Sequence, residues 1–394
     1  MQESIKLDQV IDRRNTNCAK WDTMDQVYHS QDLIHLGVAD MDFKAPQSIS
    51  DAFQSCVDHG IYGYTDINEG FYEAIIRWFR DKNHTDVKKE EILFCPRISI
   101  SVSLAVETYT NPGEEVIIHT PSYDALYEGI VKNHRVAVES PLIIRDGKYT
   151  IDFDELETLV SEKTKMYILC SPFNPVSRVW DREELEKIGA FCVKHKLLLY
   201  VDEIHGDFTA PGIQFTTALQ LADEVRDRLI VASSPTKTFN VPGVIVSYLI
   251  IPNGKYKKML EEDIHRLGMN NPNIFAVAAV EQGYRNSDDW YDAVLTYIDE
   301  NDAFTREYFG KHFPEFQIFP REGTYLLWIS YEALGCSEDE LKEWFIREAG
   351  VEVYMGTKFG EKGLGYFRLN LGTTRKMLSD AFERMRKAYP LLKK

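Results

Sequence analysis

The sequence lacks the features that mark membrane-bound, secreted and nucleic-acid-binding proteins. Among its 394 residues no apolar run reaches the length that spans a bilayer, and residues 1–4 do not begin a signal peptide. Basic residues number 45 against 62 acidic ones, so the net charge is −17, and no basic run is present. Polyanions bind proteins through clustered lysine and arginine. We therefore expect neither a nucleic acid nor a membrane as a partner.

Cysteine is sparse and catalytic signatures are few. The six cysteines are scattered and form no C-x-x-C pair, so we expect reduced thiols in a cytoplasmic protein. The sequence also has no metal-ligand spacing, no P-loop and no GxSxG elbow. A glycine-rich stretch at 360–365 has no following helix at the distance that a dinucleotide site needs. These absences argue against a metalloenzyme, an NTPase and a serine hydrolase.

What is present is an alternation of buried strands and helices that starts near residue 91. Strands that are apolar throughout are typical of a mainly parallel sheet covered by helices on both faces. The fold class is therefore α/β. Continuous apolar runs predict strands at 92–95, 116–119, 166–170, 197–201, 229–232 and 244–251, and the segments between them predict helices at 96–110, 154–161 and 181–194.

The length of the chain favours two domains that are interleaved, because no long linker separates them. We predict an N-terminal arm at 1–48, a large domain at 49–288 with the parallel sheet, and a small α/β domain at 289–394 that the arm joins. The active site would lie in the cleft between the two domains. Further elements are predicted as helices at 46–57, 70–82, 273–312, 338–348 and 374–389 and as strands at 325–329 and 351–354.

Lys237 lies between two predicted buried strands, flanked by hydroxyl residues and followed by Pro242-Gly243. It is either an exposed turn lysine or a desolvated amine held for Schiff-base chemistry, with Ser234 binding a phosphate. Ligands of parallel sheets bind beyond the carboxyl ends of the strands. Six polar residues that suit an aromatic phosphate cofactor fall near such ends and favour the second interpretation: Tyr123, Asn174, Asp202, His205, Ser234 and Lys237.

Nearly the whole chain resembles the fold-type I pyridoxal-phosphate enzymes, and within them the cystathionine β-lyase (C–S lyase) branch of the class I/II aminotransferases. The resemblance implies a large domain with a mainly parallel, seven-stranded type of sheet between helices and a smaller α/β domain. Its motifs are ADMDF at 39–43, YGYT at 62–65, TPSYD at 120–124, SPFNP at 171–175, DEIH at 202–205, SPTKTFN at 234–240, EGTYL at 322–326 and YFRLN at 366–370.

The resemblance implies pyridoxal 5′-phosphate as cofactor and assigns roles around its ring. Lys237 would carry it as a Schiff base and, once freed by the substrate amine, would remove the Cα proton. Asp202 would pair with the ring nitrogen, Asn174 would donate to the phenolic oxygen, and Tyr123 would stack on the ring face. From the residues alone, Asp202 could be a helix cap, and Tyr123 could be a core aromatic.

The remaining implied contacts hold the phosphate and the substrate. The cofactor would also contact His205. Ser234 and the backbone at Ile98 and Ser99, where a helix opens, would bind the phosphate. Tyr64 would reach it from a partner subunit, so we expect a homodimer with shared active sites. Arg368 would clamp the substrate α-carboxylate; the alternative is a surface arginine.

Three positions depart from the family pattern. Ser177 stands where glycine is usual, and Arg97 replaces a small residue beside the phosphate loop. Ile245 stands where many aminotransferases carry a phosphate-binding arginine, which the lyase branch commonly lacks. Because Ile245 supplies no cation, Arg97 could partly neutralise the phosphate; it could equally be a solvent-facing arginine.

The resemblance implies an α,β-elimination from L-cystathionine or another S-substituted L-cysteine, giving a thiol (homocysteine from cystathionine), pyruvate and ammonia. The alternatives are an aminotransferase on the same scaffold and a regulatory binding protein that retains the cofactor. A dicarboxylate transaminase needs a second cation for the substrate side chain, and the sequence identifies no residue that clearly supplies one. That absence agrees with the family motifs, which resemble the lyase branch, and on this resemblance we favour the lyase.

Overall fold

The computed structural model describes residues 5–392; residues 1–4, about which the signal-peptide prediction was made, lie outside this range. Its largest sheet has the strand order β2-β10-β9-β8-β7-β3-β4, and only β10 runs antiparallel to its neighbours. The strands are β2 (Ile92–Cys95), β3 (Glu115–Thr120), β4 (Val136–Pro141), β7 (Thr164–Cys170), β8 (Leu198–Asp202), β9 (Leu229–Ser233) and β10 (Ser247–Ile250).

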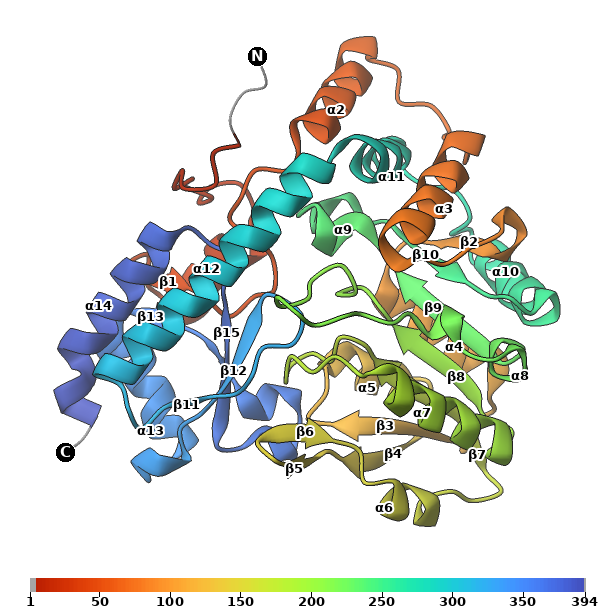
Figure 1. Cartoon of the computed structure of the whole chain (residues 1–394). Coiled ribbons are helices and arrows are strands. Elements are labelled where there is room, and N and C mark those ends of the chain that lie inside the picture. Colours follow the sequence, from red (N-terminus) through yellow and green to blue (C-terminus); the bar gives the residue numbers. More distant parts are fainter. Residues whose placement is uncertain (1–4, 393–394) are drawn as a thin grey trace.

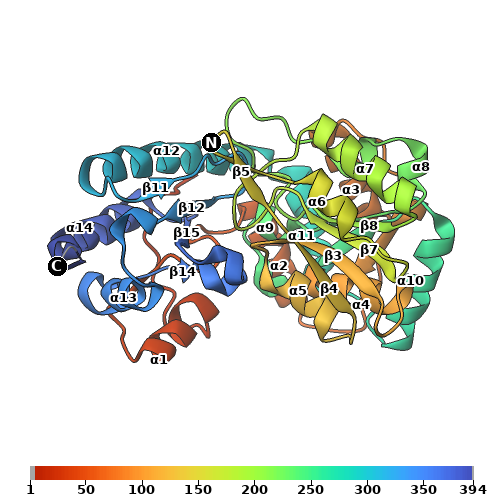
Figure 2. The same cartoon turned by 90° about the horizontal axis from the view of Figure 1, so that it is seen from below.

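Helices cover both faces of this sheet. In Figure 2 helices α4, α5 and α10 lie on one face, and α7 and α8 lie on the other. Every residue of β8 and β9 is buried, which is why these strands are apolar up to their last residues, Asp202 and Ser233. The helices around the sheet are α2 (Gln47–His59), α3 (Glu69–Asn83), α4 (Ile98–Tyr109), α5 (Asp124–Val131), α6 (Phe153–Thr158), α7 (Arg182–His195), α8 (Asp223–Arg226), α9 (Pro235–Thr238), α10 (Gly254–Arg266) and α11 (Ile274–Asn286).

A second, four-stranded antiparallel sheet has the order β11-β12-β15-β14 and is flanked by the long helix α12 and by α14 (Figure 1). A separate hairpin pairs β5 (Ile143–Arg145) with β6 (Lys148–Thr150). The elements of this C-terminal part are α12 (Asp288–His312), β11 (Gln317–Ile318), β12 (Leu326–Ser330), α13 (Glu338–Glu343), β13 (Val351–Glu352), β14 (Tyr354–Met355), β15 (Tyr366–Asn370) and α14 (Arg375–Leu392).

The N-terminal segment packs on the C-terminal part of the chain rather than on the large sheet. It contains a π-helical turn (Ala19–Thr23), α1 (Met24–Tyr28) and β1 (Ile34–His35). Strand β1 pairs in parallel with β13, more than 300 residues away. In Figure 1 this red segment accordingly lies beside the blue one. The domain boundaries predicted at 48 and 288 stay predictions.

The α/β fold class and most elements follow the sequence prediction, with three corrections. The strand predicted at 244–251 begins only at Ser247, because a 3-10 turn occupies Pro242–Val244 and Ile245 has a left-handed φ of 60°. The helical region predicted at 273–312 is divided into two helices at Ser287. The strand predicted at 351–354 is two short strands that pair with different partners.

Elements that the sequence analysis left unassigned include α5, β4 and α10, whose residues are less uniformly apolar. Within residues 5–392 there is no helix of the length and apolarity needed to cross a membrane.

Candidate active site

A cavity of about 330 Å³ lies at the carboxyl ends of β7, β8 and β9, bounded on its other side by residues that precede or belong to β15. This is the edge at which parallel sheets hold ligands. The chain thus brings together residues that are up to 330 positions apart, from Val38 to Arg368. Nine of the ten predicted site residues line the cavity: Ile98, Ser99, Tyr123, Asn174, Asp202, His205, Ser234, Lys237 and Arg368.

Lys237 is not an exposed turn lysine. It lies in α9, directly after β9, and its amine donates a hydrogen bond to the carbonyl oxygen of Ala39. Burial lowers the pKa of this amine to about 8, although the nearby Asp40 carboxylate acts in the opposite direction. A substantial fraction of the amine is therefore neutral near physiological pH, as a nucleophile or base must be.

Asp202 ends β8 as a buried carboxyl group. One of its oxygens accepts a hydrogen bond from the backbone N–H of Ile204 at 3.1 Å. Burial raises the pKa of Asp202 to about 6, with the Ile204 hydrogen bond and the Lys237 charge opposing it. Within the described part of the chain no cation lies at ion-pair distance from it. A cationic ligand group in the cavity would fill that role.

Arg368 is a buried guanidinium held by neutral groups. It donates to Asn174 Oδ1 at 2.9 Å and to the Gly37 carbonyl at 2.7 Å, and its Nε is buried without a hydrogen-bond partner. It lies 5.1 Å from the Tyr354 ring and 4.7 Å from the Phe359 ring. Burial lowers the pKa of Arg368 to about 10. Among residues 5–392 no carboxylate pairs with it, so an anionic ligand would be strongly favoured.

Asn174, Tyr123 and His205 complete the wall of the cavity. Because Asn174 Oδ1 accepts from Arg368, the side-chain amide N–H groups remain available to a ligand. Burial raises the pKa of Tyr123 to about 12, so its phenol stays protonated. Burial and the charges of Lys237 and Arg368 keep the pKa of His205 well below its ordinary value, and its Nδ1 has no partner. Each therefore meets a ligand as a neutral group.

The opposite end of the cavity is formed by the first turn of α4. Ile98 and Ser99 open this 12-residue helix, whose unpaired N–H groups suit an anion. Ser234 caps α9, accepting from Thr236 N at 3.1 Å and donating to the Val246 carbonyl at 2.6 Å. Its single proton is thus engaged, and donation to a phosphate would require that bond to break.

The three departures from the family pattern have clear positions. Arg97 is exposed and lines the cavity at the start of α4, whereas Ile245 lines it without supplying a charge. Ser177 has a φ of 61°, the region in which glycine is favoured, and its hydroxyl lies within hydrogen-bond distance of Gly323 O and Leu326 O. This explains why glycine is usual at position 177. The role proposed for Arg97 stays a prediction.

Tyr64 is the one predicted site residue that the chain does not bring to the cavity. It lies between α2 and α3 with its side chain fully exposed. Its neighbours Ile61 and Tyr62 are also exposed, at 67% and 61%. This loop therefore presents apolar side chains to its surroundings.

A backbone segment at 37–43, which we call the strap, closes the cavity beside Lys237. Asn240, which follows α9 beside the large sheet, holds it by donating to Met41 O at 2.8 Å and Phe43 O at 2.7 Å. Asn370 holds it from the small sheet, donating to Val38 O and Asp40 O at 2.7 Å. The strap thus connects both sheets to the reacting side of the cavity.

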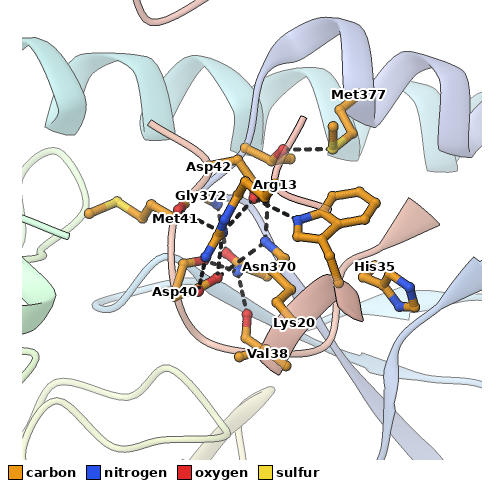
Figure 3. A network of polar contacts seen from close by, with 12 residues as sticks. Arg13, Lys20, His35, Val38, Asp40, Met41, Asp42, Asn370, Gly372 and Met377 are labelled. Atoms are coloured by element: carbon orange, nitrogen blue, oxygen red, sulfur yellow. Dashed lines mark hydrogen bonds and ion pairs between the residues drawn. The ribbon is translucent and has the colours of Figure 1, made fainter. Parts of the chain in front are cut away.

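The strap is anchored by a cluster of buried charges (Figure 3). Lys20, which has no exposed surface, lies 2.8 Å from Asp42 and 3.5 Å from Asp40. Arg13 pairs with the same two carboxylates, at 2.6 Å from Asp40 and 2.8 Å from Asp42. Burial alone would raise the pKa of Asp42, but Lys20 and Arg13 hold it below its ordinary value. The four charges balance one another inside the protein.

The cavity residues to which the sequence assigns no role include Asp124, Tyr354, Lys358 and Phe359. Lys358 and Phe359 immediately precede the glycine-rich stretch at 360–365, whose only sequence signal is a weak likeness to a dinucleotide site. Asp124 lies inside the TPSYD motif, which predicts no role for it. The missed Lys358 is a side-chain cation in the cavity, and it is paired with Asp124.

The sequence model of the family described as aminotransferase class I and II matches residues 31–385. The chain belongs to this family. Cystathionine beta-lyase PatB of Bacillus subtilis (strain 168) is 34% identical over 98% of this chain and 100% of its own length. Protein MalY of Escherichia coli (strain K12) is 30% identical over 94% of this chain and 95% of its own length.

Among solved structures, cystalysin from Treponema denticola, which contains a pyridoxal 5′-phosphate cofactor, superposes with a TM-score of 0.95. It is 32% identical, and the match covers 98% of this chain and 99% of cystalysin. The fold-type I architecture expected from the sequence is confirmed by this likeness and by the observed sheets.

The residues present fit this cofactor. Asp202 is a buried carboxylate with no ion-pair partner among residues 5–392, and Lys237 is an amine with a lowered pKa. The Nδ1 atom of His205 is buried without a hydrogen-bond partner in the same part of the chain. The helix opening at Ile98 and Ser99 lies in the same cavity and suits a phosphate.

Proposed function

We propose that this chain is a pyridoxal-phosphate-dependent carbon–sulfur β-lyase. Its substrate class would be L-cystathionine and related S-substituted L-cysteines, and its products a thiol, pyruvate and ammonia. One observation carries the proposal: the amine of Lys237, the cation-free carboxylate of Asp202 and the unpaired guanidinium of Arg368 line a single cavity. The names of PatB and cystalysin's bound cofactor support the same chemistry.

Some of the site residues would bind the cofactor, and others would bind the substrate. Lys237 would hold the cofactor, and its neutral amine would then accept the proton from the substrate Cα. Asp202 would keep the cofactor ring nitrogen protonated, while Asn174 and Tyr123 would fix the ring's orientation. When bound, pyridoxal phosphate supplies an electron sink for the charge that proton removal leaves behind.

Arg368 would fix the substrate by its α-carboxylate. A bidentate grip orients the Cα–H bond toward Lys237 and the Cβ–S bond for departure, which is a large part of catalysis by positioning. A thiolate is a weak base and therefore leaves readily, which favours elimination over return of the proton. The phosphate would lie at Ile98 and Ser99, with Ser234 and His205 beside it.

The product assay is the test. Purified protein supplied with cofactor and L-cystathionine should release homocysteine and pyruvate without any added 2-oxo acid. Lys237→Ala is the matched inactive control, and should release neither. Amino transfer to a 2-oxo acid that outpaces pyruvate formation from every thioether would identify an aminotransferase instead. Cofactor binding without turnover of any substrate would favour the regulatory protein.

The assembly we propose is a homodimer in which Tyr64 of each subunit reaches the partner's phosphate. Tyr64 is fully exposed and outside its own cavity, and it shares its loop with exposed Ile61 and Tyr62. Inactive Tyr64→Ala and Lys237→Ala proteins should regain activity when mixed, because a hybrid dimer contains one intact site. A wild-type protein that is monomeric and active would contradict this.

The domain division at 48 and 288 is also a proposal. It is supported by the pairing of β1 with β13 and by the break between α11 and α12 at Ser287. Hydrogen exchange should then resolve two cooperative units with that boundary. A cytoplasmic location is supported by the six free cysteines, and cell fractionation would test it.

A further inference from the structure

Two charged residues that line the cavity and have no role in the proposed lyase chemistry form an ion pair with each other. Lys358 Nζ lies 3.1 Å from Asp124 Oδ2. Asp124 opens α5, which packs on the large sheet, whereas Lys358 lies in the 3-10 turn Gly356–Phe359 next to the small sheet. The side chains are 38% and 43% exposed. Both therefore line the cavity and remain within reach of a ligand.

This pair is the part of the cavity's charge that no proposed role uses. Asp202, Lys237 and Arg368 are assigned to the cofactor and to the substrate α-carboxylate, and Arg97 lies at the phosphate end. The remaining charges are one carboxylate and one ammonium, which balance each other. A ligand group that replaces this pair without leaving a charge unmatched must itself carry one positive and one negative charge.

The pair also lies within about 10 Å of Arg368, the predicted α-carboxylate ligand. The Tyr354 ring centroid lies 5.1 Å from the Arg368 guanidinium carbon and 5.0 Å from Lys358 Nζ. The two cations are therefore no more than about 10 Å apart. The two α-carbons of an extended cystathionine are roughly 6 Å apart by ordinary chain geometry, so its two carboxylates can address both cations.

Beyond the pair lies a second cavity of about 290 Å³. It shares Asp124, Lys358 and Phe359 with the first cavity, so the pair stands between them. Thr120 and Ser122 also line it, and their hydroxyl groups are buried without a hydrogen-bond partner. Unpaired buried hydroxyls are costly and mark a place where a polar ligand group gains hydrogen bonds.

We propose that Asp124 and Lys358 select substrates whose sulfur carries a distal amino-acid group, as in L-cystathionine. Asp124 binds the distal ammonium and Lys358 the distal carboxylate, so one internal ion pair is exchanged for two with the substrate. Thr120 and Ser122 hydrogen-bond the same group. This inference rests on the proposed lyase function and names its substrate class. A dicarboxylate would leave Asp124 facing a like charge or unpaired.

The experiment compares three substrates of the holoenzyme: L-cystathionine, its analogue that lacks the distal amino group, and S-methyl-L-cysteine. For Lys358→Met, the kcat/KM ratio of cystathionine over S-methyl-L-cysteine should fall about tenfold, a loss in the range of one charged hydrogen bond. For Asp124→Asn, discrimination between cystathionine and the analogue should narrow by a similar factor. Lys376→Met, which breaks an exposed ion pair elsewhere, is the matched control and should change neither ratio.

Swapping the charges of Asp124 and Lys358 distinguishes two roles for the pair: binding the distal group of the substrate, or only joining the two sides of the cavity. The double variant Asp124→Lys/Lys358→Asp can form the ion pair again. In it, however, the distal ammonium of cystathionine would face the cation at 124, and the distal carboxylate would face the anion at 358. Under our proposal its preference for cystathionine stays low, with thermal unfolding as in the wild type. Recovery of the wild-type preference in this variant would overturn the proposal.

Failure of the inference and failure of the lyase function are distinguishable. If the wild type cleaves cystathionine and S-methyl-L-cysteine but the variants keep its substrate ratios, the specificity pair is wrong and the lyase stands. If the wild type cleaves neither, the lyase function is wrong, and the inference falls with it.

Discussion

Arg368 and Asn174 are 194 residues apart in the chain and joined by a 2.9 Å hydrogen bond inside the cavity. One belongs to the small sheet and the other to the loop after β7. The bond fixes the guanidinium next to the group expected to meet the cofactor. The predicted contact of Arg368 with the substrate and that of Asn174 with the cofactor are therefore coupled. A substitution at either residue should alter the position of the other side chain.

Replacing Arg368 by lysine should impair substrate binding more than cofactor binding. Lysine retains a charge but cannot form the two parallel hydrogen bonds of a guanidinium or reach both Asn174 and Gly37. We expect kcat/KM for cystathionine to fall by roughly 10- to 100-fold, the value of one charged hydrogen bond or more. Steady-state kinetics measures kcat/KM, and a cofactor titration measures cofactor affinity. A larger loss of cofactor affinity than of kcat/KM would contradict the assignment of Arg368 to the substrate carboxylate.

The reactivity of Lys237 in cofactor-free protein should depend on pH with a midpoint near 8. Burial lowers its pKa from 10.5 to about 8, so the neutral amine forms more than two pH units lower than usual. Competitive labelling with an amine-directed reagent, read by mass spectrometry, gives this midpoint. Asp40→Asn should lower it further, because the Asp40 charge raises this pKa. A midpoint at 10.5 would show an ordinary exposed lysine.

The same shift has a consequence for stability. Between pH 8 and 10.5 the unfolded chain keeps the Lys237 proton that the folded chain has lost. The contribution of Lys237 to stability therefore improves as pH rises through this window. In Lys237→Met protein this part of the pH dependence should disappear, which denaturant unfolding across the window measures. Identical pH slopes in the two proteins would argue against the shift.

Ser177 should tolerate glycine better than alanine. A φ of 61° at position 177 strains any residue that has a Cβ. Serine compensates for this strain because its hydroxyl lies within hydrogen-bond distance of Gly323 O and Leu326 O. Ser177→Ala keeps the strain and removes the hydrogen bonds, at a cost of about 1–3 kcal/mol. Ser177→Gly also removes them but relieves roughly 1 kcal/mol of strain. Urea unfolding should therefore rank serine above glycine above alanine; an alanine variant as stable as the glycine variant would refute this account.

Removing the charge of Lys20 should destabilise the protein and loosen the strap. Among residues 5–392, Lys20→Met leaves Asp42 and Asp40 with Arg13 as their one ion-pair partner in a largely buried setting. Breaking a buried charge network from one side costs about 3–5 kcal/mol. Lys376→Met, at an exposed pair, should cost less than about 0.5 kcal/mol. Thermal unfolding gives the comparison, and protease sensitivity at 37–43 reports on the strap. Equal losses of stability in the two variants would mean that the buried cluster stabilises the fold no more than an exposed ion pair does.

Much of the architecture could be predicted because it depends on local patterns. Apolar runs specify buried strands, and the segments between them are amphipathic, so the α/β class and the order of most elements follow from the chain alone. Polar residues that follow such strands must gather at one edge, which is why Asp202, Ser234 and Lys237 were found as a group. The start of the strand predicted at 244–251 was wrong because Ile245 has a left-handed backbone conformation, which an apolar pattern does not reveal.

The sequence by itself therefore determined the sheet, the family motifs and which polar residues share an edge. Only the tertiary structure decided how far each of them is desolvated and what it faces. The lowered pKa of Lys237, the unpaired guanidinium of Arg368 and the exposure of Tyr64 depend on groups distant in sequence. The pair of Asp124 and Lys358, 234 residues apart, is of the same kind. Burial and electrostatics act through space, and neither is encoded in the spacing of neighbouring residues.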